Sequence, residues 1–399
     1  MHSTDVLLQI AIAIVAATLA AFLARLLRQP IILGYIAAGL LVGPTGGFGW
    51  VSMEAIEPIS ELGLILLLFM IGLEIDLKKL LRAGKPLVSA GVGQFVICVA
   101  LGLAFWPMLG FGLHRGHFDA IYLAVACALS STMIVIKLLH DKFELDTTAG
   151  RLSLGILVFQ DIWAILFLAV QRDLYNPAVS AIFLSLAKGI ALVITAFVVS
   201  RYLLPPLFRS IAQVPELMVI GALGWCFGVA MFASWLGLSR EMGALVAGIA
   251  LSTFPYNLDV IAKIVSLRDF FITLFFVTLG ARVERPDWDT VTIALLGSAF
   301  VIASRFLSIA PILQLTRAGS RASVITSINL SQISEFSLVI CALGFGLGHI
   351  DQEIVSIVVM MLLLCVSGRA AKREEPAAAR RGAGLPAGPR PWRLLIAAP

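Results

Sequence analysis

The chain has 399 residues, of which 60% are hydrophobic and only 13% are charged, and its formal net charge is +5. Soluble globular proteins usually carry about 25% charged residues, so this composition excludes them and indicates a chain that lies in a lipid bilayer. Apolar stretches of roughly 17–25 residues, long enough to cross ~30 Å of hydrocarbon as helices, recur throughout. We therefore predict an all-α polytopic membrane protein. About 13 transmembrane helices are expected, at residues 5–27, 30–43, 57–74, 86–107, 118–139, 149–171, 178–200, 214–235, 241–256, 267–282, 288–314, 321–345 and 353–368.

Basic residues are distributed unequally between the two sets of loops. Most fall in loops on one side of the predicted helices, and examples are Lys78, Lys79, Arg82, Lys85, Arg201 and Arg209. Cytoplasmic loops carry such an excess of Lys and Arg. The rule places the amino terminus outside and the carboxyl terminus in the cytoplasm. It also explains the positive net charge without a nucleic-acid partner.

Two pairs of segments suggest an internal repeat. The stretch "GYIAAGLLVG" at 34–43 is similar to "GALVAGIALS" at 243–252, and "LLFMIGLEIDL" from Leu67 is similar to "FFVTLGARVE" from Phe275. Because the matching helices would run in opposite directions, we predict two inverted repeats within a transmembrane domain at 1–368. The first covers about 5–171, the second about 214–368, and the helix at 178–200 connects them. Secondary transporters are often built in this way, with their sites near the bilayer midplane.

Two predicted spans contain clusters of hydroxyl, amide and acidic side chains in mid-membrane. These are Ser130, Ser131 and Thr132 in one span, and Ser331, Gln332 and Glu335 in the other. Hydroxyl groups can bond to backbone carbonyls and so compete with regular helix, which predicts local unwinding in both spans. Hydrogen bonding between intact helices is the alternative interpretation.

Three ionisable residues are expected at midplane depth: Asp161, Arg305 and Glu335. A carboxylate in that position is expected to bind either a proton or a cation, because an isolated ionised acid is expensive there. That competition is the chemistry of an antiporter, and it makes Asp161 the candidate carrier, with the Gln160 carbonyl oxygen as a further ligand. Arg305 stays charged, and Glu335 would pair with it or accept backbone N–H bonds in the unwound segment. A purely structural ion pair is the alternative for these two residues.

A series of motifs from residue 1 to about 366 carries a family resemblance. It includes "RQPIILGYIAAGLLVGP", "ELGLILLLFMIGLEIDL", "ALSSTMIVIKLL", "GRLSLGILVFQD" and "LSQISEFSLVI". In this order the motifs resemble those of the bacterial Kef-type monovalent cation:proton antiporters, a branch of the sodium/proton exchanger superfamily. The resemblance implies two inverted repeats whose two broken helices cross in a mobile core. It also implies a dimerisation domain, hence a homodimer, in the bacterial inner membrane.

The resemblance also assigns site residues. The ion- and proton-binding set would be Asp161, Gln160, Ser130, Ser131 and Thr132, and the residues supporting the helix crossing would be Arg305, Glu335, Gln332 and Ser331. Two departures from the family pattern bear on these roles. Ile333 and Ser334 replace the usual small pair before the acid, and the basic residue of the eleventh helix is Arg rather than Lys. No catalytic residue, cofactor or resident metal is expected.

The predicted function is exchange of K⁺ or Na⁺ for protons by alternating access. A gated cation channel or efflux pore without proton coupling is the alternative, because the same cavity would conduct if both gates opened together. A metal transporter is disfavoured because the five histidines lie at helix ends or in loops. Residues 369–399 are rich in Ala, Arg, Pro and Gly, which predicts a disordered cytoplasmic tail; a reading-frame shift would also produce such a composition.

Overall fold

The computed structural model describes residues 6–27, 29–74, 84–112, 118–174, 179–211, 215–252, 257–283 and 287–365. Within these ranges all regular secondary structure is helical. The α-helices are α1 (Val6–Leu26), α2 (Ile31–Val42), α3 (Met53–Glu74), α5 (Lys85–Phe105), α6 (Asp119–Ala128), α7 (Thr132–Asp141), α8 (Thr148–Val170), α9 (Val179–Tyr202), α10 (Leu204–Ile211), α11 (Pro215–Trp235), α12 (Arg240–Ser252), α13 (Asn257–Arg282), α14 (Trp288–Leu315), α15 (Ser320–Leu330), α16 (Glu335–Gly346) and a last helix, Gln352–Cys365. Short 3₁₀ helices follow α5 (η1, Trp106–Leu109) and α8 (η2, Gln171–Asp173). The predicted tail lies outside the described residues.

The prediction of an all-helical membrane protein is confirmed, but the number of 13 spans is not. In the described ranges eight helices are long and apolar enough to cross a membrane, or nine if the bent pair α15–α16 forms one span. Each predicted span coincides with a helix or a broken pair of helices. Helices α2 and α12 are too short for a full span, with only 12 and 13 residues, and so is the last helix, Gln352–Cys365.

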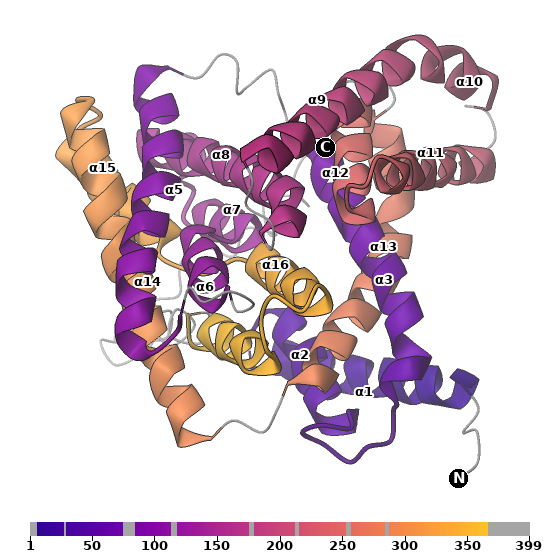
Figure 1. Cartoon of the computed structure of the whole chain (residues 1–399), viewed down its shortest axis with the longest axis horizontal. Helices are drawn as coiled ribbons and strands as arrows, with labels where there is room; N and C mark the ends of the chain where they lie inside the picture. Colours follow the sequence, from indigo (N-terminus) through magenta and orange to yellow (C-terminus); the bar gives the residue numbers. More distant parts are fainter. Residues whose placement is uncertain are drawn as a thin grey trace, which may run out of the picture.

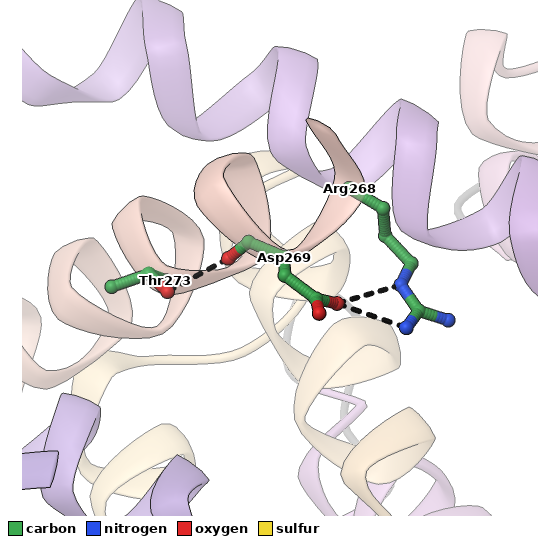
Figure 2. A network of polar contacts seen from close by, with 3 residues as sticks. All are labelled: Arg268, Asp269 and Thr273. Carbon is green, nitrogen blue, oxygen red and sulfur yellow. Dashed lines mark hydrogen bonds and ion pairs between the residues drawn. The ribbon is translucent and has the colours of Figure 1, made fainter. Parts of the chain in front are cut away.

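A polar contact near the middle of α13 is visible in Figure 2. The Arg268 Nε and NH2 groups both lie 2.9 Å from Asp269 Oδ1, and the Thr273 hydroxyl donates to the Asp269 backbone oxygen. An exposed ion pair of this kind contributes about 0–1 kcal/mol. Further along the helix, Phe276 and Val277 are buried, and α13 packs against α2 and α3.

The helices form two groups (Figure 1). Helices α1, α2, α3, α11, α12 and α13 pack together on one side, and we call this group the panel bundle. Helices α5 to α8 and α14 to α16 pack together on the other side with the last helix, and we call this group the core bundle. Helix α9 contacts α12 in the first group and α8 in the second.

The backbones of α2 and α13 approach each other so closely that two positions of the panel bundle have room only for glycine. A Cβ atom added to Gly39 would lie 2.0 Å from the Val277 backbone oxygen, and one added to Gly280 would lie 2.1 Å from the Ile36 backbone oxygen. Real Cβ atoms do not come so close to backbone atoms. Close approach of membrane helices is favoured by such small residues, because van der Waals packing replaces the hydrophobic effect in lipid.

Candidate ion site at the crossing of two broken helices

The first break separates α6 from α7. Residues 129–131 are not helical, and Leu129 and Ser131 have extended backbone conformations. The Ser131 hydroxyl caps α7 by accepting a hydrogen bond from the Ile134 N–H at 3.3 Å, and Ser130 and Ser131 are both buried. The predicted unwinding is confirmed at these two serines, whereas Thr132 is the first residue of α7.

The second break separates α15 from α16, which meet at a bend of 46°. The unwound residues are 331–334, and Ser334 caps α16 by accepting a hydrogen bond from the Phe336 N–H at 3.1 Å. Ser331 donates its hydroxyl hydrogen to the Ser327 backbone oxygen at 2.6 Å. Glu335 begins α16, where a carboxylate is favoured by the helix dipole.

The two breaks lie against each other, as expected for crossing helices. The Ser130 hydroxyl donates to the Leu330 backbone oxygen at 2.8 Å, and the Gln332 amide donates to the Ser131 backbone oxygen at 3.1 Å. Backbone groups freed by unwinding must find partners inside a membrane protein. At this crossing, each broken helix supplies side-chain donors for carbonyl groups of the other.

Helix α8 brings Gln160 to the first break. Its Oε1 atom accepts a hydrogen bond from the Ser130 N–H at 2.7 Å, and its Nε2 atom donates to Gln94 Oε1 at 2.8 Å. The Gln160 side chain is 1% exposed, and the following residue, Asp161, is half-buried. The amide thus positions α8 at the crossing, and the Gln160 oxygen that was predicted as a cation ligand is engaged by a backbone N–H.

The analysis of the sequence missed Gln94, which lies in α5. Its Nε2 atom donates to the Ala128 backbone oxygen at 3.0 Å while its Oε1 atom accepts from Gln160. Gln94 therefore joins the end of α6 to α8. A signal was present, because Gln94 is fully buried in an otherwise apolar stretch of α5, and an amide at such a depth needs a partner.

Arg305 caps both broken helices from α14. Its Nε atom donates to the Leu330 backbone oxygen at 3.0 Å, its NH2 group donates to the Cys127 backbone oxygen at 2.7 Å, and its NH1 group donates to the Cys98 sulfur at 3.1 Å. Leu330 ends α15, and Cys127 is the last residue but one of α6. The last carbonyl groups of a helix lack partners and carry partial negative charge. One buried guanidinium group neutralises the carboxyl ends of two half-helices.

This arrangement differs from the expected charge pair between Arg305 and Glu335. Within the described residues the hydrogen bonds of the guanidinium group go to two helix ends and a sulfur, and Glu335 instead lies at the amino-terminal end of α16. The physical reason is that each charge meets the helix end of opposite sign, which removes the need for direct pairing.

A cavity of about 390 Å³ opens between the two bundles. It lies at the end where α3 and α12 begin and where α8 and α13 finish, which is the predicted outer side. Its charged lining residues are Glu57, Glu61, Arg172, Arg240, Glu241 and Arg282. Gln171, which follows α8, also lines it and is ten residues beyond Asp161, a separation of roughly 15 Å along a helix. The cavity thus approaches the crossing from one side.

The fold and the crossing together define a multi-pass membrane protein of the type built on two broken helices. The chain belongs to the sodium/hydrogen exchanger family, since the family model described as "Sodium/hydrogen exchanger, transmembrane" matches residues 11–369. The sodium proton antiporter MjNhaP1 from Methanocaldococcus jannaschii has the same fold, with a TM-score of 0.64 at 18% identity over 92% of this chain and 96% of that structure.

Three relatives of known name are similar over most of the chain. K(+) efflux antiporter 4 of Arabidopsis thaliana is 29% identical over 87% of this chain and 60% of its own length. The iron transporter MagA of Paramagnetospirillum magneticum is 28% identical over 88% of this chain and 80% of its own length. The putative cation/proton antiporter YbaL of Escherichia coli is 27% identical over 90% of this chain and 66% of its own length. The chain thus spans about three-fifths of the plant relative, and the resemblance to cation:proton antiporters is confirmed for family and fold.

Proposed function

We propose that the chain is the membrane part of a secondary transporter that exchanges a monovalent cation, K⁺ or Na⁺, for protons by alternating access. Asp161 is the carrier, and its carboxylate binds a proton or a cation in turn. The observation that carries the proposal is the 2.7 Å hydrogen bond from the Ser130 N–H to Gln160 Oε1, because it holds the residue next to Asp161 against the crossing of two broken helices. Unwound backbone at such a crossing is a common place for coupling ions.

The surrounding charges support a single titrating carrier. The guanidinium group of Arg305 is directed at helix ends, and Gln160 and Ser130 do not change charge over the ordinary pH range. Of the two acids in this region, Glu335 begins α16, where the helix dipole favours its charged form, and the half-buried Asp161 is the one that we assign to alternate in charge. Loading the carboxylate with either ion neutralises its charge inside the membrane, so that the two ions compete for one site.

Several finer expectations belong to the same proposal. The matched glycines of the panel bundle support two inverted repeats at about 5–171 and 214–368, and α9 fits the connector at 178–200. The unequal distribution of basic residues supports an outer amino terminus in a bacterial inner membrane. The likeness to exchangers supports a homodimer and a transmembrane domain at 1–368 with a cytoplasmic tail at 369–399.

Exchange would be tested in proteoliposomes that contain a pH-sensitive dye. Imposing a K⁺ or Na⁺ gradient on vesicles with the wild-type protein should move protons in the opposite direction. The Asp161→Asn variant should lose this flux, while the control Asp146→Asn, at an exposed loop position, should keep it. Cation flux without proton counterflow would favour the channel, and normal exchange by Asp161→Asn would overturn the carrier assignment.

A further inference from the structure

Gln332 carries a buried oxygen for which the described residues supply no hydrogen-bond donor. Its side chain is 0% exposed, and its Oε1 atom has no partner. The orientation of the amide is fixed, since Nε2 lies 3.1 Å from the Ser131 backbone oxygen and that atom can only accept. A buried acceptor without a partner is unfavourable, and this one lies inside the unwound segment of the second broken helix.

The neighbouring oxygen atoms at the crossing already have protein partners. Gln160 Oε1 accepts from the Ser130 N–H, and the Ser130 hydroxyl donates to the Leu330 backbone oxygen. The Ser131 hydroxyl accepts from the Ile134 N–H. Gln332 therefore offers the neutral side-chain oxygen that is left over for a ligand.

We infer that Gln332 Oε1 is a direct ligand of the transported monovalent cation at the helix crossing. This inference rests on the proposed function and adds a residue to its cation site. An amide oxygen can replace a water molecule in the hydration shell of K⁺ or Na⁺, as carbonyl oxygens do in ion-selective pores. It does not bind a proton in the ordinary pH range, so Gln332 raises the affinity for the cation and not the affinity for the proton.

Two substitutions separate this role from that of holding the Ser131 carbonyl group. Gln332→Leu has a similar volume but removes both the oxygen and the donor, and Gln332→Glu keeps an oxygen while losing the donor. Gln314→Leu, at an exposed position of α14, is the matched control. Proton flux would be measured in proteoliposomes over graded K⁺ and Na⁺ concentrations, and the shift of unfolding temperature by each cation would be measured in detergent.

The inference predicts that Gln332→Leu raises the KM for the cation about tenfold, as loss of one contact to a charged ligand does, with a smaller effect on the maximal rate. The stabilisation by the cation should fall in parallel. Gln332→Glu should keep the KM at or below the wild-type value, and Gln314→Leu should match the wild type.

A Gln332→Leu variant with the wild-type KM would overturn the inference. If Gln332→Leu does not fold, the Gln332→Glu variant decides between the two roles. A tenfold higher KM for Gln332→Glu would show that the Nε2 donor to the Ser131 carbonyl group matters rather than the oxygen, and would overturn the inference. Failure of the proposed function is distinguishable from both results, since the wild-type protein itself would then show no cation-driven proton flux.

Discussion

Gly72 and Gly248 face each other backbone to backbone where α3 crosses α12. A Cβ atom on Gly72 would lie 2.3 Å from the Leu245 backbone oxygen, and one on Gly248 would lie 2.1 Å from the Phe69 backbone oxygen. The contact between Gly39 and Gly280 repeats this geometry between α2 and α13. The two similar pairs of segments match Gly39 with Gly248 and Gly72 with Gly280. When each glycine is replaced by its counterpart in the other half of the chain, the contact between α3 and α12 becomes the contact between α13 and α2. A pair of symmetry-related repeats requires this exchange.

Gly248→Ala is expected to destabilise the protein by about 1–3 kcal/mol or more, because the added methyl group meets backbone atoms that cannot move aside alone. Gly224→Ala in α11 is the matched control, since no atom outside its own helix lies within 4 Å of the added group. Thermal unfolding in detergent would measure both variants. An equal unfolding temperature for the two would contradict the close contact between α3 and α12.

Arg305 is expected to be essential for the stability of the crossing. Arg305→Met leaves the Cys127 carbonyl group without its guanidinium donor and leaves the Leu330 carbonyl group with only the Ser130 hydroxyl. A buried acceptor without a partner costs about 1–3 kcal/mol. Arg305→Lys keeps the charge but cannot reach three partners in a fixed geometry, so it should be intermediate. The yield of monodisperse protein and its unfolding temperature would give this order. A fully stable Arg305→Met variant would refute the capping role.

Gln94→Leu is expected to slow exchange about tenfold, which corresponds to about 1.4 kcal/mol on the barrier, because Gln160 would lose its 2.8 Å partner. The preference between K⁺ and Na⁺ should stay unchanged, since Gln94 acts through Gln160. Initial rates of proton flux with each cation would provide both measurements. A changed preference at a normal rate would instead make Gln94 a ligand.

His349 is expected to make stability depend on pH. Its Nδ1 atom lies 2.8 Å from the Tyr122 hydroxyl in the loop before the last helix, and burial lowers the pKa of His349 below its ordinary value of 6.5. The unfolded chain then binds the proton more readily than the folded one. This contribution to stability is present above the ordinary pKa and is lost as the pH falls below it.

The measurement is the unfolding temperature between about pH 5 and pH 8, the range in which histidine changes charge. The His349→Gln variant should show a smaller loss of stability on the acid side than the wild type. Carboxylates titrate in both proteins and cancel in the comparison. Parallel curves for the two proteins would rule out His349 as a source of the pH dependence.

Local chemistry made the two breaks predictable, because clustered hydroxyl groups favour unwinding wherever they occur in an apolar helix. The partners of Arg305 were not predictable in the same way. Its hydrogen bonds reach residues that lie 25 and 178 positions away in the sequence. Opposite charge suggested Glu335 as the partner of Arg305, but the carboxyl ends of two helices accept the hydrogen bonds instead. Gln94 was missed because one amide in an apolar span indicates that a partner is needed but does not indicate which residue is that partner. The number of 13 spans is not confirmed in the described ranges, because apolar runs were counted without regard to helix length and α2 and α12 have only 12 and 13 residues.

The position of Arg305 also has a consequence for biosynthesis. The carbonyl group of Cys127, near the end of α6, accepts from Arg305, which the ribosome adds 178 residues later. All helices of the panel bundle have been synthesised by then. The first half of the chain therefore enters the bilayer with one of its helix ends uncapped, and only insertion of α14 completes it. A protein severed between its halves would need both fragments in the same membrane before either could adopt its native form.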